Sequence, residues 1–369
     1  MAEAQPQKFT FDGKFKDDLA RSKRFMEYLQ ESSKRGNRAD EAQLASLNIA
    51  RMPCRVMYTE GGSRLIEYDV LGKPERRIPI LMMYSFINRW YILDLQPDHS
   101  FIEALSKAGF QVYLLDWGIP GPEHSTLGLD YYLEKVARRA VQRIKRKHGG
   151  NPISLFGYCI GGTLAAMMAG LHPEDFASQI LLTTPLDFKD SGILGLWTNK
   201  EFFDPAKIAN AFGCIPEEIL HAPFPLMRPK ESVAKNRVLF DNVLNDEYLQ
   251  NFKAIDRWAT DNVPFPGQVY KEFIGECYQN NSLAAGKMHI NKRLVDLSAI
   301  RTPTLNIFAT HDPIVPPAAA VKTPEILVNS PTENHEYPVG HITVTVGHPI
   351  RKQVWAETVS WMEKVGVGG

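Results

Sequence analysis

Strand-like apolar runs alternate with helical patterns through much of the chain. Four runs have the length of strands and are apolar at most positions, which is typical of strands buried on both faces of a sheet. The stretches between them have the amphipathic spacing of helices, and one of them ends at Gly109. The strand-like runs are 78–86, 111–118, 152–159 and 177–186, and the helical stretches are 101–109, 131–150 and 161–171. This alternation predicts an α/β fold, with a mostly parallel sheet and helices on both faces.

The N-terminal part of the chain follows other patterns. Residues 1–52 are mostly polar, and their apolar residues recur at helical spacing, so we expect one or two amphipathic helices there. Residues 54–70 form two β-like runs around Gly61 and Gly62, which predicts a hairpin. The apolar positions of the first segment include Leu19, Phe25, Met26 and Leu29.

A long segment then interrupts the strand rhythm. Residues 187–297 are rich in aromatic residues, proline and polar helical patterns, and strand-like runs resume only at 302–312 and 334–342, before a last helix. We therefore predict three parts. An N-terminal helical segment covers 1–52, an α/β core covers 53–186 and 298–369, and a mostly helical cap, or lid, covers 187–297.

The composition of the chain argues against several kinds of protein. Lys plus Arg equals Asp plus Glu at 42 each, so the chain has no general attraction to nucleic acid or to anionic membranes. Its four cysteines are far apart and lack the spacing of a zinc or redox motif, so we expect no metal. The N-terminus lacks the pattern of a secretion signal, and no apolar stretch is long enough to cross a bilayer. We expect a cytoplasmic protein with free thiols and no transmembrane segment.

The segment 156–163, Phe-Gly-Tyr-Cys-Ile-Gly-Gly-Thr, carries the strongest chemical signal. It lies between a predicted strand and a predicted helix, as the nucleophile elbow of the α/β-hydrolase fold requires, with Cys159 in the nucleophile position. Glycines on either side permit the tight turn. We expect the backbone N–H of Ile160 to be one oxyanion donor, and an N–H near Phe86 or Ile87 to be the second. The alternative for a free cysteine is an inert core residue.

Two later residues complete a catalytic set with Cys159. Asp312 and His341 stand near the ends of the last two predicted strands, in the chain order that this fold requires. His341 would accept the thiol proton, and Asp312 would hold the imidazole in the required tautomer. Asp116 also stands at a strand end, where it has either a structural role or a role in a substrate loop. A cysteine acyl-enzyme is a thioester, close in energy to an acyl-CoA, and this favours acyl transfer.

Several separated segments resemble the polyhydroxyalkanoate synthases. The similarity extends over roughly residues 55–360. It is carried by the segments 156–164, 87–118, 181–188, 251–262, 291–309 and 338–342. The resemblance implies that Cys159, Asp312 and His341 are catalytic. It also implies that the enzyme polymerises 3-hydroxyacyl-CoA, for example 3-hydroxybutyryl-CoA, into a polyester with release of CoA. No cofactor is implied beyond this CoA thioester substrate.

The short chain resembles the catalytic subunit of class III or class IV synthases. That resemblance implies a homodimer, a second and different synthase subunit as partner, and a place at the surface of polyester granules. The sequence departs from the family at Pro313, where a histidine often follows the catalytic aspartate. This departure concerns the handling of CoA or the choice of substrate, and leaves the three catalytic residues in place.

Two other functions remain open from the sequence. One is a cysteine-dependent hydrolase resembling dienelactone hydrolase, although that family lacks a cap of this size. The other is a catalytically silent granule-binding homologue, against which the complete catalytic set argues. The aromatic residues of the cap either line an apolar path for the polymer or pack the cap onto the core. They include Phe202, Phe203, Phe224, Phe240, Phe252 and Trp258.

Overall fold

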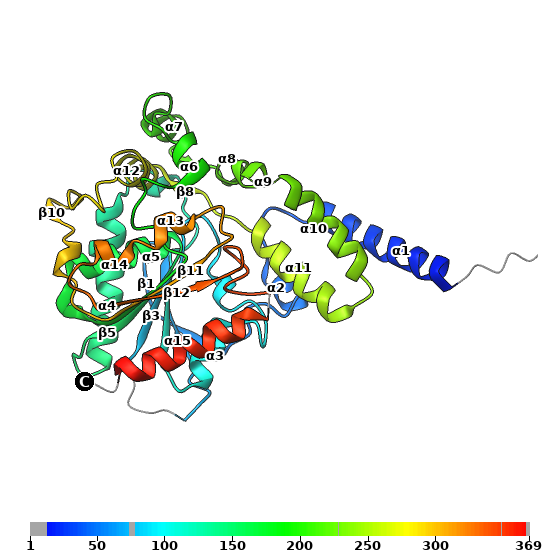
Figure 1. Cartoon of the computed structure of the whole chain (residues 1–369), viewed down its shortest axis with the longest axis horizontal. Helices are drawn as coiled ribbons and strands as arrows, with labels where there is room; N and C mark the ends of the chain where they lie inside the picture. Colours follow the sequence, from blue (N-terminus) through cyan, green and yellow to red (C-terminus); the bar gives the residue numbers. More distant parts are fainter. Residues whose placement is uncertain (1–12, 74–77, 228, 348, 367–369) are drawn as a thin grey trace, which may run out of the picture.

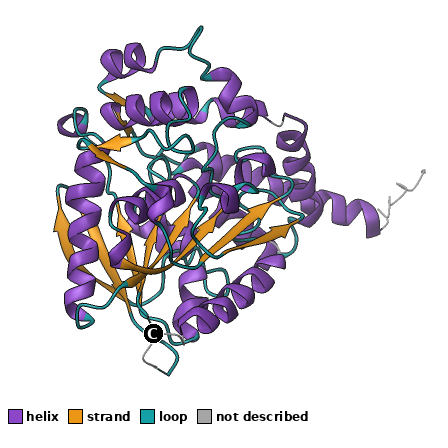
Figure 2. Cartoon of the chain, turned by 60° about the vertical axis from the view of Figure 1, so that its left-hand side comes forward, coloured by secondary structure: helices purple, strands orange, loops and turns teal. Residues whose placement is uncertain are grey.

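An eight-stranded sheet forms the centre of the protein (Figures 1 and 2). The computed structural model describes residues 13–73, 78–227, 229–347 and 349–366. The strand order is β1-β2-β4-β3-β5-β6-β11-β12. The strands are β1 (Cys54–Glu60), β2 (Ser63–Tyr68), β3 (Ile80–Met83), β4 (Val112–Asp116), β5 (Ile153–Tyr158), β6 (Phe176–Leu182), β11 (Thr304–Ala309) and β12 (Thr332–Tyr337).

The sheet is parallel except at one edge. The six strands from β4 to β12 pair in parallel, whereas β1 and β2 form an antiparallel hairpin that joins β4. Gly61 and Gly62 make its turn, and both have positive φ angles, of 51° and 84°. Every residue of β3, β4 and β5 is buried, as expected for strands covered on both faces. The predicted hairpin and the predicted parallel sheet are thus both confirmed.

Helices cover both faces of this sheet (Figures 1 and 2). On one side, α3 (Phe101–Lys107) packs with α15 (Ile350–Gly366) through the rings of Phe101 and Trp355, whose centroids lie 5.9 Å apart. On the other side lie α4 (Arg138–Lys147) and α5 (Ile160–Leu171). A seven-residue π-helix, Tyr131–Ala137, leads into α4. The remaining short helices of the core are α13 (Pro317–Ala320), α14 (Thr323–Ile326) and the 3-10 turns η1 (Trp90–Leu93), η2 (Pro122–His124), η4 (Pro173–Asp175) and η6 (Leu297–Ala299).

The chain between β6 and β11 is mostly helical, as predicted. It also contains two small antiparallel pairs, β7 (Cys214–Ile215) with β8 (Phe265–Pro266), and β9 (His289–Ile290) with β10 (Arg293–Leu294). Strands of two residues are too short to show the alternation of apolar and polar positions by which a strand is predicted from sequence. The helices are α6 (Gly192–Trp197), α7 (Pro205–Phe212), α8 (Glu217–His221), α9 (Pro223–Met227), α10 (Pro229–Asn242), α11 (Asp246–Thr260), α12 (Gly267–Phe273) and the π-helix η5 (Ile274–Gln279). We call this part of the chain the cap.

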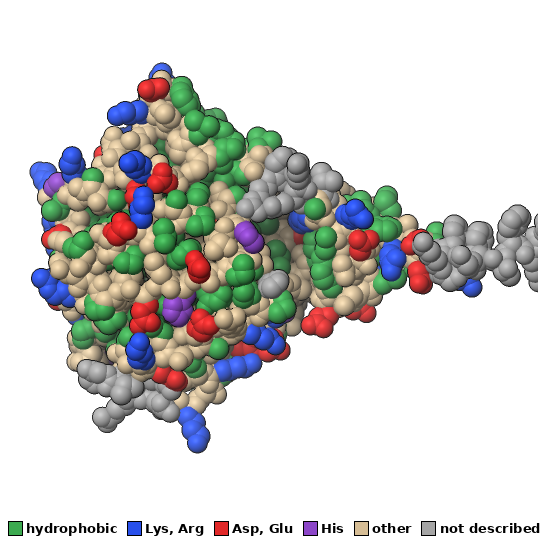
Figure 3. Space-filling model, in the orientation of Figure 1, with side chains coloured by type: hydrophobic (Ala, Val, Ile, Leu, Met, Phe, Trp, Pro, Cys, Tyr) green, Lys and Arg blue, Asp and Glu red, His purple; other side chains and the backbone are tan. Residues whose placement is uncertain are grey.

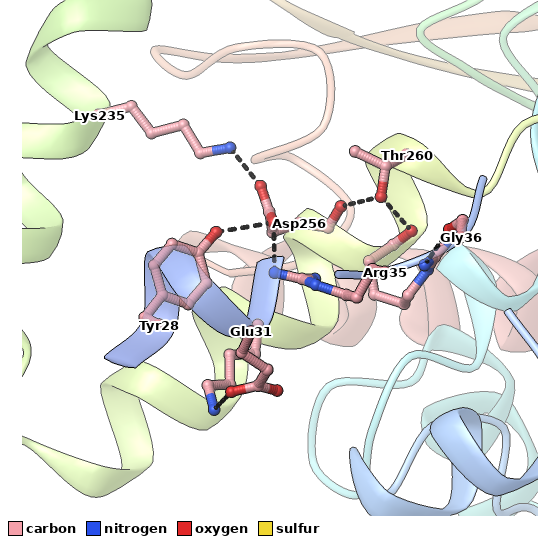
Figure 4. Close-up of polar contacts among 9 residues, drawn as sticks. Tyr28, Glu31, Arg35, Gly36, Lys235, Asp256 and Thr260 are labelled. Atoms are coloured by element: carbon pink, nitrogen blue, oxygen red, sulfur yellow. Dashed lines mark hydrogen bonds and ion pairs between the residues drawn. The ribbon is translucent and has the colours of Figure 1, made fainter. Parts of the chain in front are cut away.

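Two N-terminal helices, α1 (Gly13–Ser33) and α2 (Glu41–Ser46), occur in the described part of the predicted segment 1–52, whose residues 1–12 lie outside the described residues. With α10 and α11, α1 forms a lobe beside the sheet (Figure 1). A small apolar cluster around Tyr28 joins the three helices, and Asp256 of α11 binds the Tyr28 hydroxyl at 2.7 Å. The same carboxylate pairs with Lys235 of α10 at 2.7 Å and with Arg35, which follows α1, at 3.2 Å (Figure 4). One buried carboxylate therefore ties three segments together.

The surface has no dominant sign of charge on the face shown in Figure 3, where acidic and basic side chains are interspersed. This agrees with the formal net charge of zero. Within the described ranges, no helix has both the length and the apolar character needed to cross a membrane.

Candidate active site

The elbow between β5 and α5 holds Cys159 in a strained backbone conformation. Its φ and ψ angles are 56° and −127°, a region that costs a non-glycine residue about 1–3 kcal/mol. The glycines on either side make the turn possible, because a Cβ on Gly157 would collide with the backbone of Gly162, and one on Gly161 would collide with Met83. The thiol is nearly buried, at 8% exposed. The turn thus fixes the sulfur at the N-terminus of α5.

Asp312 follows β11 and is fixed through both of its carboxylate oxygens. Oδ1 accepts the backbone N–H groups of Ile314 and Val315 at 2.8 and 2.9 Å. Oδ2 is 2.6 Å from Nδ1 of His341. Because Pro313 has no N–H, it takes no part in this turn, and the carboxylate is held by the two residues after it. The acid and the base predicted from the sequence are therefore in direct contact.

His341 follows β12 and lies between Asp312 and Cys159. Burial lowers the pKa of His341, but the charges of Asp312 and Cys159 and its hydrogen bonds to both outweigh burial and raise that pKa to about 10. The ring also lies beside Tyr158, with centroids 5.4 Å apart. A raised pKa means that the positive imidazolium is favoured when its two neighbours are negative. The structure thus brings together all three residues that the sequence singled out.

The candidate oxyanion donors lie on two sides of Cys159. Ile160 is the first residue of α5, so its N–H has no acceptor within the helix. On the loop after β3, the hydrogen bond that the Ile87 N–H makes within the described part of the chain is a long one, 3.4 Å to Oγ of Ser85. Ile87 lines both cavities beside Cys159, whereas the side chain of Phe86 packs among Trp117, Tyr132 and Phe265. This geometry favours Ile87 over Phe86 as the second donor.

Two cavities meet at Cys159, between the core and the cap. The larger has a volume of about 320 Å³ and an almost wholly apolar wall, to which the cap contributes Phe203, Phe224 and Phe273. The smaller, of about 140 Å³, includes Cys159, His341, Trp258 and His221. A more polar hollow of about 580 Å³ lies elsewhere and touches none of the three predicted catalytic residues.

The cap aromatics divide between the two roles considered from the sequence. Phe203, Phe224 and Trp258 line the cavities beside Cys159. Phe240 and Phe252 instead pack against Phe25 and Tyr28 of α1, with ring centroids 5.7 and 5.6 Å apart. Phe202 is 68% exposed and does neither. Because these contacts are long-range, the sequence pattern could not separate the three groups.

Asp116, the other aspartate at a strand end, has a different environment. Its carboxylate accepts from Arg64 at 2.6 Å, from the Tyr84 hydroxyl at 2.8 Å and from the Gly118 N–H at 3.0 Å. Every one of these partners belongs to the core. Of the two roles left open, this arrangement fits the structural one.

One group of metal-binding residue types occurs among the described residues, formed by His172, Glu174 and Asp175. Asp175 pairs with Lys145 and Arg138, and His172 binds Glu134 at 2.9 Å. These carboxylates and the imidazole already have partners of their own, so the group is a network of ion pairs.

The fold places the protein in a known class. A family model described as the alpha/beta hydrolase fold matches residues 79–347. Among solved structures, a thermostable carboxyl esterase from Bacillus coagulans aligns with a TM-score of 0.55 at 16% identity, over 85% of this chain and 99% of that one. A putative lipase from Acinetobacter baumannii aligns with a TM-score of 0.51 at 15% identity, over 88% and 96%. The protein has the α/β-hydrolase fold.

Sequence similarity is more specific. A model described as the N-terminus of poly-beta-hydroxybutyrate polymerase (PhaC) matches residues 13–105. The poly(3-hydroxyalkanoate) polymerase subunit PhaC of Allochromatium vinosum is 32% identical over 356 residues, which cover 95% of this chain and 99% of that protein. The PhaC subunit of Haloferax mediterranei is 35% identical over 326 residues, 88% of this chain but only 66% of that longer protein. The chain belongs to the poly(3-hydroxyalkanoate) polymerase family, whose members are enzymes of the acyltransferase type.

Proposed function

We propose that this protein polymerises 3-hydroxyacyl-CoA, for example 3-hydroxybutyryl-CoA, through an acyl group bound to Cys159. The observation that carries the proposal is the line Asp312–His341–Cys159, in which His341 contacts both neighbours and Cys159 sits on the strained elbow. Family membership supplies the reaction type. The residues supply the means for each step.

In the first half-reaction, Cys159 becomes acylated. His341 takes the thiol proton, and the thiolate attacks the thioester carbonyl of the acyl-CoA. The carbonyl oxygen becomes an oxyanion that faces the N–H groups of Ile160 and Ile87. The bond between the carbonyl carbon and the CoA sulfur then breaks, and the departing sulfur takes the proton from His341. One thioester is exchanged for another, so the step is close to thermoneutral.

In the second half-reaction, the 3-hydroxyl of another acyl unit replaces the cysteine sulfur. His341 takes the hydroxyl proton as the oxygen attacks the carbonyl carbon of the acyl-enzyme. A new ester bond forms, the carbon–sulfur bond to Cys159 breaks, and the proton on His341 returns to the cysteine sulfur. Asp312 keeps Nδ1 of His341 protonated throughout, so that Nε2 remains the atom that exchanges protons.

Water must be kept from the acyl-enzyme, or hydrolysis would compete with chain growth. The apolar wall of the larger cavity, contributed mostly by the cap, supports this part of the proposal. An apolar cavity of this kind also suits an aliphatic polyester better than a charged or sugar-like acceptor.

The test measures CoA release from 3-hydroxybutyryl-CoA with a thiol reagent and analyses the product for polymer in the same tube. CoA release with insoluble polyester is expected, and release with free 3-hydroxybutyrate would instead indicate a hydrolase. Cys159→Ala should abolish release, because it removes the attacking sulfur. Cys54→Ala is the matched control, since Cys54 is an exposed thiol outside the cavities. Unchanged turnover in Cys159→Ala would refute the assignment of the nucleophile.

We also propose that the chain works as a homodimer with a second synthase subunit, at the granule surface. The names of the relatives describe them as subunits. Leu19 and Met26 on α1 are 61% and 52% exposed, and so are available for a protein contact. If the isolated chain releases no CoA, the assay is repeated with a candidate partner subunit, and failure there as well would refute the proposed activity.

A further inference from the structure

The loop after β3 and the start of η1, residues 87–91, contact the cap through four of their five residues. Nε2 of His221 in α8 lies 3.3 Å from the Ile87 carbonyl oxygen. The Asn88 side chain donates to that of Asn262 at 3.0 Å. Further contacts join Trp258 Nε1 to the Arg89 carbonyl at 2.8 Å, and the Tyr91 hydroxyl to Asp261 at 2.7 Å. Two separate stretches of the cap, at α8 and at the end of α11, therefore form hydrogen bonds with one short segment.

This loop is also the one that approaches Cys159. Ile87 lines both cavities beside the sulfur, and among the described residues its N–H has Ser85 Oγ as its one acceptor, at the long distance of 3.4 Å. Because this hydrogen bond is long and weak, the N–H can exchange it for a bond to a stronger acceptor, such as an oxyanion, with little loss of free energy. Oxyanion donors act only when they already point at the developing charge. The direction of the Ile87 N–H therefore depends on the contacts that fix the next peptide group, which carries the Ile87 carbonyl.

His221 is suited to fix that peptide. Its ring is partly buried against Phe224, with centroids 5.3 Å apart, and it lines the smaller cavity together with Cys159 and His341. Burial lowers the pKa of His221 and outweighs the opposite effect of its hydrogen bond to Ile87. The lowered pKa favours the neutral ring, and because the Ile87 carbonyl can only accept, Nε2 carries the hydrogen in this contact.

We propose that His221 is a positioning residue. It holds the peptide after Ile87 and so aims the Ile87 N–H at the oxyanion formed on Cys159. This inference rests on the proposed acyl transfer and adds a condition to it. The second oxyanion donor is in place only while the cap sits on the core, so the cap completes the active site as well as covering it.

The test compares His221→Leu with His221→Gln, whose side-chain amide can still donate to the Ile87 carbonyl. Acylation is followed as the first turnover of CoA release from 3-hydroxybutyryl-CoA. Loss of an oxyanion donor costs about 10²–10³-fold in rate, so a misaimed donor in the Leu variant should slow acylation by roughly 10- to 100-fold. The Gln variant should recover most of the wild-type rate. His289→Leu, an exposed histidine of β9 outside both cavities, is the control and should behave as wild type.

A second measurement separates positioning from general damage. Alkylation of Cys159 by iodoacetamide forms no oxyanion, so the Leu variant should be alkylated at the wild-type rate while its acylation is slow. Acylation at the wild-type rate in the Leu variant would overturn the inference. So would a parallel loss of acylation and alkylation that Gln does not restore, because this would show a role in the fold alone. Trp258→Phe, which removes the contact to the Arg89 carbonyl but keeps an aromatic ring, should show the same pattern with a smaller loss.

A third measurement is independent of the proposed reaction. Amide hydrogen exchange of peptides covering 84–92 should be faster in His221→Leu than in the wild type, and unchanged in His221→Gln. Equal exchange in all three proteins would overturn the positioning role, whatever the reaction is. Suppose instead that the wild type forms no acyl-enzyme, while exchange is still faster in His221→Leu and unchanged in His221→Gln. That result would refute the proposed function but support the positioning of the loop by the cap.

Discussion

Two buried aspartates at the ends of parallel strands have different partners in this protein. Asp116 ends β4, and Asp312 lies three residues beyond β11; their side chains are 4% and 1% exposed. Both accept backbone N–H groups from residues just after them. The difference lies in the side-chain partners. For Asp116 these are the Arg64 guanidinium and the Tyr84 hydroxyl, whereas for Asp312 the partner is the imidazole of His341.

The partner decides what the carboxylate can do. Arg64 is always charged and cannot take up or release a proton, so its pair with Asp116 works as a fixed link between β2 and β4. Burial and Asp116 raise the pKa of Tyr84, which therefore stays protonated and donates to the same carboxylate. His341 in contrast can gain and lose a proton, so Asp312 influences a group that changes state. Position at a strand end alone does not distinguish the two cases.

The largest contrast is expected for the amide substitutions of these aspartates. In Asp312→Asn the two backbone N–H groups still find an oxygen, but the amide nitrogen then faces Nδ1 of His341. This favours the tautomer with hydrogen on Nε2, which cannot accept the proton of Cys159. The rate of CoA release should fall by about 10⁴-fold, as for other triads with this change. Asp116→Asn should keep near wild-type activity per folded molecule, and equal losses in the two variants would erase the distinction.

For the free energy of unfolding, the order of the two aspartates should reverse, with the larger loss at Asp116. Asp116→Ala removes the acceptor of the buried Tyr84 hydroxyl and the anchor of Arg64, and should lower the free energy of unfolding by about 3 kcal/mol. Arg64 is 42% exposed and can turn to water, which limits the loss. Urea unfolding followed by circular dichroism gives the value. Asp312→Asn should unfold close to the wild type, and a larger loss there than in Asp116→Ala would contradict the structural role of Asp116.

A smaller effect should appear in the dependence of stability on pH. Although burial lowers the pKa of His341, Asp312 and Cys159 together bring it to about 10, above the value of about 6.5 for an unfolded chain. A group with a raised pKa stabilises the fold fully below pH 6.5, and this contribution is lost as the pH rises toward 10. Between pH 7 and 8 the wild type should therefore lose about 1 kcal/mol relative to His341→Gln, measured by urea unfolding at each pH. Parallel curves for the two proteins would show that His341 is not held in its charged form.

Most of the core could be predicted because its signals are local. Each buried strand is a continuous apolar run, and the elbow around Cys159 is a contiguous motif whose glycines have a steric reason. The acid and the base could be found from the order of the strands, since parallel strands bring their ends to one edge of the sheet. The structure confirms these elements and brings the three residues together. Their catalytic role remains a prediction for the assays above.

The contacts of the cap could not be predicted, because they join distant parts of the chain. His221 reaches a residue 134 positions away, and Trp258 reaches one 169 positions away. Trp258 lies in a segment that resembles the family and His221 does not, but neither segment has a pattern that indicates which loop it meets. The roles of Phe240 and Phe252 were open for the same reason, since their partners are on α1.

Three consecutive residues of α11 connect the N-terminal segment with the loop beside Cys159. Asp256 binds Tyr28 and Arg35, and Arg257 donates to the backbone carbonyls of Gly36 and Asn37 at 2.9 Å each. Trp258, the next residue, holds the loop beside Cys159. A single turn of α11 thus contacts both the N-terminal segment and the loop beside Cys159. A helix is stiff over one turn. The N-terminal segment and the loop beside Cys159 are therefore held in fixed positions relative to each other while that turn stays in place.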